Sequence, residues 1–228
     1  MLEKSTFVPA PKALPFLAMI YVIIIVSSTT LVYKIVSFGF VTITAGALLS
    51  PAWYSLGDVI AEIYGYQLSR RIIWFGLICE GLFVFLCSNL IKLPSPDYWH
   101  HQAAYNSVLG ALPRIYLGSI VGTIVGAFSN TYLLSKWKIL LKGNHFWLRA
   151  VGSNAVGQLI FSCLTAFIDL LGVVPITDIF KIIFASYSIK VILVPILAIP
   201  AAVLVIYLKK YEGFDVYDTN TNFNPFKF

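Results

Sequence analysis

Two acidic residues, Asp58 and Glu62, lie four positions apart in a segment of this chain that is otherwise almost entirely apolar. On a helix this spacing places both carboxylates on one face. An ionised carboxylate near the middle of a bilayer costs roughly 2.5–3.5 kcal/mol, so it usually has a partner, a water-filled cavity or a ligand. The pair could accept hydrogen bonds from a ligand, or it could reach the membrane surface and pair with Arg70 or Arg71. The sequence leaves both interpretations open.

Further polar residues interrupt other apolar segments. Asn154 and Gln158 are again four residues apart, and they either bind a ligand or join neighbouring helices. Glu80 and Lys190 fall near the middle of their segments, where an ion pair between them is geometrically feasible. Because Lys190 is far from either end of its segment, it is the basic residue that most needs a functional explanation. Buried polar groups of this kind favour transport among membrane functions.

The elements that must position these residues are membrane-spanning helices. Hydrophobic residues make up 59% of the 228 residues, charged residues only 11%, and the mean hydropathy is +0.85. Soluble domains have about 45–50% apolar and about 25% charged residues, which argues strongly against a soluble protein. A span needs about 20 apolar residues. Six segments meet this requirement: 14–33, 41–63, 72–91, 111–134, 150–171 and 182–208.

Basic residues set the predicted orientation. With a cytoplasmic N-terminus, eleven of the sixteen Lys and Arg residues fall on the cytoplasmic side and four outside, and Lys190 lies within a span. Both termini are then cytoplasmic. We expect an N-terminal segment over 1–13, an all-α transmembrane domain over 14–210 and a loosely ordered tail over 211–228. Six spans would allow an inverted 3+3 repeat, in which the second and fifth spans correspond.

Other patterns argue against metal sites and enzymes. The three cysteines have no C-x-x-C spacing and are expected to be buried thiols, so neither a metal site nor a disulfide is predicted. The histidines lie in predicted loops, and neither an H-E-x-x-H nor a G-x-S-x-G motif occurs. No G-x-x-x-x-G-K-[ST] motif is present, so ATP hydrolysis by this chain is not expected. Gly118, Gly122 and Gly126 predict a face for close helix packing.

The second span and its flanks resemble the queuosine precursor transporter family, also called the VUT family. The resemblance is carried by Ala-Gly-Ala-Leu-Leu-Ser-Pro at 45–51, by Asp-x-x-x-Glu-Ile-Tyr-Gly at 58–65 and by the arginine pair that follows. It continues through Trp147-Leu148-Arg149 and ends in the last span with Tyr187, Lys190 and Pro195. It covers nearly the whole chain, and the block around 58–65 is specific. The resemblance implies a bacterial inner-membrane transporter of 7-deazapurines such as 7-cyano-7-deazaguanine.

One position departs from the family pattern. The family places an Asp shortly after the Gly-Gln of the fifth span, whereas this chain has Phe161 there. Asp169 follows eight residues later, too far to replace that carboxylate on the same turn. This difference from the family pattern affects which queuosine precursor the chain binds, or how it binds that precursor.

The resemblance and the polar residues together predict a substrate site. A deazaguanine presents a ring N–H beside an exocyclic amine, which one carboxylate can bind, and its planar face suits an aromatic side chain. Glu62 is the first candidate, and Gly65, Arg70 and Arg71 are assigned to structure or gating. The other predicted substrate-binding residues are Asp58, Asn154, Gln158, Lys190, Glu80, Tyr64 and Trp74, with Trp53 and Tyr54 as further aromatic candidates.

We therefore predict import of a 7-deazapurine by alternating access, with no cofactor and no nucleic-acid partner. The partners expected are the small-molecule substrate and the lipid bilayer, and a homodimer stays open. Uniport, proton symport and facilitation driven by downstream metabolism all fit the sequence. The alternative is a substrate-binding subunit of an ATP-driven vitamin or nucleobase importer, which would need an ATPase partner.

Overall fold

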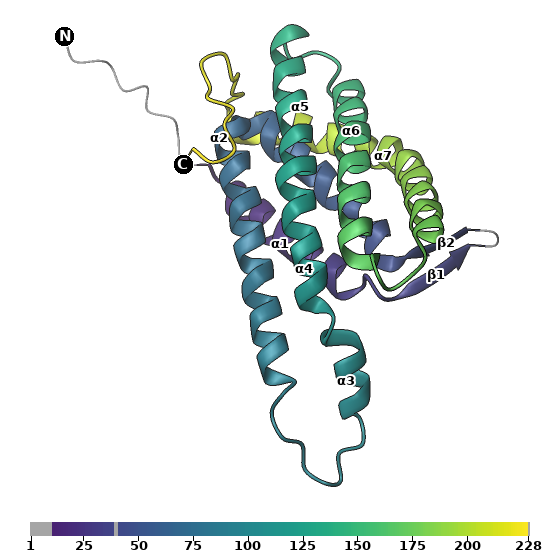
Figure 1. Ribbon diagram of the computed structural model, residues 1–228. Coiled ribbons are helices and arrows are strands. Elements are labelled where there is room, and N and C mark those ends of the chain that lie inside the picture. Colours follow the sequence, from purple (N-terminus) through teal and green to yellow (C-terminus); the bar gives the residue numbers. More distant parts are fainter. Residues whose placement is uncertain (1–10, 39–40, 228) are drawn as a thin grey trace.

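The computed structural model describes residues 11–38 and 41–227. Helices dominate these residues, with one short β-hairpin near the start (Figure 1). The predicted segment 1–13 lies mostly outside the described residues. The elements in chain order are α1 (Leu14–Thr30), β1 (Ile35–Phe38), β2 (Val41–Thr44), α2 (Ala45–Leu90), α3 (Gln102–Leu109), α4 (Leu112–Gly122), the π-helical turn η1 (Thr123–Ala127), α5 (Phe128–Leu140), α6 (Phe146–Leu170) and α7 (Ile176–Glu212).

Four helical stretches are long and apolar enough to cross a membrane: α2, α3–α5 taken as one helix over Gln102–Leu140, α6 and α7. The shorter α1 is also apolar. Large apolar side chains are exposed along one stripe of α2, where Phe75, Ile78, Leu82 and Phe85 are each more than half exposed. This helical spacing is typical of a lipid-facing surface. The prediction of an all-α chain with several candidate membrane spans is confirmed at this level.

The second and third predicted spans form one element that is interrupted at Gly65. That residue has φ +79° and ψ 172°, a conformation open to glycine and costly for other residues. Residues 66–71, expected to form a connection, are helical instead. The helix begins at Ala45 and not at residue 41, because the Thr44 side chain accepts a hydrogen bond from the Ala47 amide at 3.2 Å.

The residues before α2 form an antiparallel hairpin that the sequence analysis did not predict. Ile35 pairs with Thr44 and Val36 with Ile43. The β-branched residues of both strands favour this extended conformation. The hairpin therefore replaces the start of the predicted span 41–63.

Contacts between distant segments define two ends of the molecule. At one end, the backbone N–H groups of Lys12 and Ala13 donate to the Glu212 carboxylate at 3.0 and 2.7 Å. At the opposite end, Arg114 donates to the carbonyls of Ile168 (2.9 Å) and Leu171. We call the first the tail end, because residues 213–227 lie there, and the second the hairpin end, where β1 and β2 lie; α3 and the loop before it extend beyond the hairpin end (Figure 1).

The glycine face packs against α6 as predicted. An added Cβ at Gly122 would lie 2.7 Å from the Thr165 side chain, and one at Gly126 would lie 2.8 Å from the Gly157 carbonyl oxygen. These distances leave no room for a methyl group. Small residues thus let α4, η1 and α6 approach closely.

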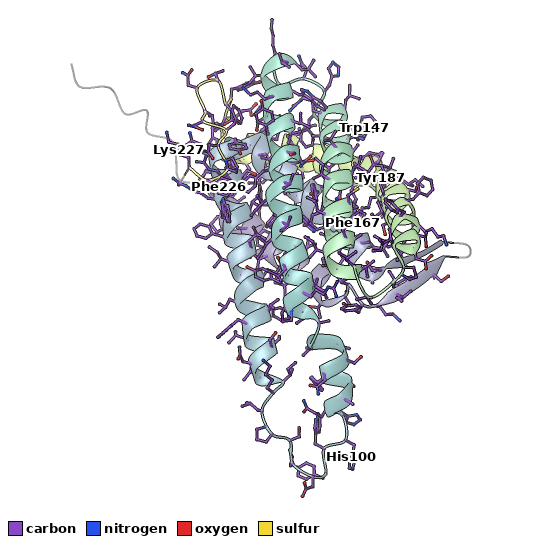
Figure 2. The ribbon with its side chains drawn as sticks, in the orientation of Figure 1. His100, Trp147, Phe167, Tyr187, Phe226 and Lys227 are labelled. Carbon is purple, nitrogen blue, oxygen red and sulfur yellow. The ribbon has the colours of Figure 1, made fainter. Side chains whose placement is uncertain are left out.

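The expectation of a loosely ordered tail is wrong. The tail packs along the second half of α2, where Phe226 and Lys227 lie (Figure 2). Tyr66 Oη donates to the Phe223 carbonyl at 2.8 Å, and Trp74 Nε1 donates to the Pro225 carbonyl at 2.8 Å. Polar groups on this helix thus bind the backbone of the tail, which the sequence pattern did not reveal.

Candidate functional site

Glu62 lies at the end of the first half of α2, fully surrounded by protein. Arg149, from the start of α6, donates to both carboxylate oxygens at 2.8 and 3.0 Å. Lys209 of α7 donates to one of them at 2.9 Å. A bidentate arginine with a second cation is a strong, geometrically specific arrangement. Glu62 is therefore held by three charge-assisted hydrogen bonds from within the chain.

Two further charges complete this arrangement at the tail end. Lys138 Nζ lies 3.9 Å from Glu62 and contacts Asp215 at 2.5 Å. Lys209 also pairs with Asp215 at 2.8 Å. We call Glu62, Lys138, Arg149, Lys209 and Asp215 the tail-end charge cluster. It connects α2, α5, α6, α7 and the tail through ion pairs.

The arginines expected to pair with Glu62 or Asp58 lie elsewhere, so that interpretation is wrong. Arg70 donates to the carbonyls of Asn222 (3.3 Å) and Asn224 (2.7 Å) in the tail, and Arg71 is exposed. The break at Gly65 separates both arginines from the half of α2 that carries the carboxylates. The contacts of Arg70 with the tail fit the structural role, which was one of the two roles assigned to it.

Asp58 is held by two amides. Asn130 of α5 donates to one carboxylate oxygen at 2.7 Å, and Asn154 of α6 donates to the other. Asn130 was missed by the sequence analysis, although it was a polar residue inside a predicted span. The side-chain oxygens of both asparagines are buried without a hydrogen-bond partner among the described residues. The Asp58 carboxylate itself is satisfied by the protein.

Glu80 and Lys190 do not pair, contrary to the expectation. Glu80 accepts hydrogen bonds from Thr29 (2.5 Å) and Ser119 (2.9 Å). Lys190 donates to Ser162 at 2.8 Å, and its Nζ lies 5.3 Å from the centre of the Phe161 ring. Lys190 is 3% exposed, and no ion pair to it occurs among the described residues. Its charge is therefore met only by a hydroxyl and an aromatic face.

A cavity of about 110 Å³ lies between α1, the first half of α2, α4, α6 and α7, nearer the hairpin end. Such a volume accommodates several water-sized groups. Serine and threonine side chains make up much of its polar wall. The charged residues that line it are Asp169 and Lys190, and the aromatic residues are Trp53 and Phe161.

The aromatic side of the cavity includes the residue that departs from the family pattern. Phe161 meets Trp53 edge-on, with ring centres 5.5 Å apart, and Tyr54 lies behind them at 6.0 Å from Phe161. Tyr64 and Trp74, the other predicted aromatic contacts, instead bind Glu212 and the tail. The aromatic rings that line the cavity are thus those of Trp53 and Phe161, which meet edge-on.

The structure divides the predicted site residues into two groups. Lys190 lines the cavity, and Gln158 lies behind it, accepting a hydrogen bond from the lining residue Ser50 at 3.3 Å. Glu80 is connected to the cavity through Thr29 and Ser119, which line it. The remaining predicted residues lie outside the cavity lining: Asp58, Glu62, Asn154, Tyr64 and Trp74.

Comparison with known proteins identifies the family. A family model described as "Putative vitamin uptake transporter" matches residues 44–205, more than half of the chain. The chain belongs to this family. It is a family of membrane transporters, so the chain is not an enzyme. This agrees with the resemblance seen around residues 58–65.

Two curated relatives have more specific names. The chain is 27% identical over 160 residues to the "Probable queuosine precursor transporter" of Bacillus subtilis, covering 70% of each chain. It is 28% identical over 148 residues to the "Queuosine precursor transporter" of Escherichia coli K12, covering 64% of each chain. No solved structure matches the chain.

Proposed function

We propose that this chain imports 7-deazapurine precursors of queuosine, such as 7-cyano-7-deazaguanine, across the bacterial inner membrane. The names of the two relatives indicate the substrate class. The observation that carries the proposal is the cavity, which combines the Lys190 ammonium with the aromatic rings of Trp53 and Phe161. An apolar pocket with a few polar groups is the usual form of a site for a planar heterocycle.

Six membrane crossings follow if the two halves of α2 each cross once. Gly65 at the tail end separates these halves, and α1, α4–α5, α6 and α7 supply the other crossings. Lys138, Arg149 and Lys209 lie at the tail end, which supports a cytoplasmic tail end by the positive-inside rule. The contact between Asp58 and Asn154 supports an inverted repeat, because it joins the second and fifth crossings.

Alternating access assigns opposite roles to the two ends. The cavity lies near the hairpin end, whereas the tail-end charge cluster closes the path toward the tail. Release of substrate into the cytoplasm then requires the cluster to separate. Lys209 and Asp215 are its more exposed members, with side chains 25% and 28% exposed, so their ion pair is the weakest point of the closure.

Uptake of labelled 7-cyano-7-deazaguanine into liposomes that contain only the purified chain tests this proposal. We expect uptake without ATP, and about 10- to 100-fold lower apparent affinity for Lys190→Met, because a hydrogen bond from a charged group contributes about 1.5–3 kcal/mol. Lys181→Met is the matched control, since Lys181 is exposed and pairs with Asp178. Its uptake should equal that of the wild type.

Each contrary result has a defined meaning. Failure of the wild type to take up any 7-deazapurine would contradict the substrate class. Uptake that appears only after an ATPase is added would favour the importer-subunit alternative. Wild-type affinity in Lys190→Met would remove the cavity as the substrate site. A cellular assay of queuosine in tRNA, in cells unable to make the precursor, checks the result in vivo.

A further inference from the structure

We propose that Asp169 is the carboxylate that recognises the substrate, accepting hydrogen bonds from the edge formed by a ring N–H and the neighbouring exocyclic amine. Lys190, at the other end of the cavity, then donates to an acceptor on the same ligand. This inference rests on the proposed function and specifies its binding site. It predicts a planar heterocycle with an amidine-like edge as the ligand class.

The first support is the free hydrogen-bonding capacity of Asp169. Its side chain lines the cavity, the residue is 8% exposed, and Oδ1 is buried without a partner. In the described part of the chain, no hydrogen bond or ion pair to either of its carboxylate oxygens is found. A buried acceptor left in this state costs about 1–3 kcal/mol or more, so it calls for an explanation.

The second support is the contrast with the three buried carboxylates among the predicted site residues. Asp58 accepts from two asparagines, Glu80 from two hydroxyls, and Glu62 from an arginine and a lysine. Arg114 is a nearby cation, yet it donates to the backbone carbonyls of Ile168 and Leu171. Among these four carboxylates, Asp169 is the one whose oxygens accept no hydrogen bond in the described part of the chain.

The packing of α4 fixes the position of this carboxylate. A Cβ added at Gly118 would lie within contact distance of both Asp169 oxygens, closer to Oδ1 than any real Cβ approaches an atom. Gly118 therefore provides the space that the carboxylate occupies against α4. A side chain with so little freedom loses little conformational entropy when it binds a ligand.

The distance between the two charges suits a two-ring heterocycle with a substituent. Lys190 bonds Ser162, and Asp169 follows Ser162 by seven residues on α6, which corresponds to a rise of about 10 Å. The Phe161 ring lies beside the Lys190 ammonium, and Trp53 meets this ring edge-on. A ring N–H and an adjacent amine resemble the guanidinium fork that carboxylates bind in bidentate fashion.

Competition for uptake tests the assignment. Liposomes with the full chain take up labelled 7-cyano-7-deazaguanine in the presence of the unlabelled compound or its analogue that lacks the exocyclic amine. We expect the wild type to prefer the parent compound by about 10- to 100-fold. Asp169→Asn should bind the parent about 10- to 100-fold more weakly and reduce the preference to about threefold or less. Asp178→Asn, an exposed carboxylate outside the cavity, is the control and should match the wild type.

The outcomes separate this inference from the proposed function. Uptake by the wild type together with an unchanged amine preference in Asp169→Asn would overturn the inference and leave the proposed function standing. If Asp169→Asn does not fold, Asp169→Ser is measured in its place and judged by the same criterion. The inference would also be overturned if, for the wild type, analogues without the amine or with a methylated ring N–H competed for uptake as well as the parent compound does. Absence of uptake by the wild type would contradict the proposed function itself.

Discussion

Buried charges form ion pairs in the tail-end charge cluster, whereas those that line the cavity form none among the described residues. In the cluster, Glu62 and Asp215 each contact at least two cations. In the cavity, Asp169 and Lys190 form no ion pair with each other or with another described residue. A charge that the protein satisfies holds the structure together, whereas a charge that it leaves unsatisfied is available to a ligand. Whether a buried charge is paired within the protein therefore distinguishes a structural role from a ligand-binding role better than the extent of its burial does.

This difference changes the assignment of the carboxylates in the second crossing. Asp58 and Glu62 were the first candidates for substrate contact, and both are fully bonded inside the protein. A substrate would have to displace Arg149 to reach Glu62 in this conformation. We therefore assign Glu62 to closure of the tail end and the cavity to binding.

The largest expected effect is that of Glu62→Gln. Removing this charge leaves three buried or partly buried cations around one remaining carboxylate, Asp215, and breaking a buried pair costs about 3–5 kcal/mol. We expect a lower midpoint of thermal unfolding in detergent and less folded protein. Asp97→Asn, at an exposed loop position, serves as control. Normal stability with a specific loss of substrate affinity would instead place Glu62 in the binding site and break the comparison.

An intermediate effect is expected from Phe161→Asp. This change adds a carboxylate to the cavity and so allows an ion pair there, as in the tail-end charge cluster. Because the Phe161 ring centre lies 5.3 Å from Lys190 Nζ, the new carboxylate can pair with that ammonium. We expect about tenfold weaker uptake of 7-cyano-7-deazaguanine, corresponding to about 1.4 kcal/mol, and a changed preference among precursors. Phe161→Leu removes the ring without adding charge and so separates stacking from pairing. Identical uptake by both variants would show that pairing of Lys190 is irrelevant.

The smallest expected effect concerns Asp218 in the tail. Its carboxylate accepts from the Tyr66 amide at 2.9 and 3.1 Å, which caps the second half of α2 after the break at Gly65. Asp218→Ala should lower the free energy of unfolding by about 1 kcal/mol, as loss of an N-cap does. Substrate affinity should stay unchanged, since Asp218 does not line the cavity. A change in affinity with no change in stability would contradict the separation of the two regions.

Sequence patterns predicted features that depend on one helix. The apolar runs, the shared face of Asp58 and Glu62 and the glycine face of α4 all follow from spacing along a single element. The hairpin was missed because Val41–Thr44 is apolar enough to be read as the start of a span. The sequence therefore predicted the membrane class, and the exact start of α2 required the pairing of β1 with β2.

The partners of each polar group could not be predicted, because they come from distant parts of the chain. Arg149 and Lys209 lie 87 and 147 residues after Glu62. Asp169 was judged only by its distance from Phe161 along one helix, whereas its importance depends on Lys190 in α7. Spacing along the sequence shows which residues lie on the same face of a helix. Only the tertiary packing shows which residues from other parts of the chain lie against that face.

The capping of Tyr66 by Asp218 also has a consequence for how the protein is made. The two residues are 152 positions apart, so at about 5–20 residues per second the ribosome adds Asp218 roughly 8–30 s after Tyr66. Throughout that interval the start of the second half of α2 lacks its cap, and Arg70 and Trp74 lack the carbonyls that they bind in the finished protein. Synthesis of the first crossings therefore precedes completion of this junction, which needs residues 218–225.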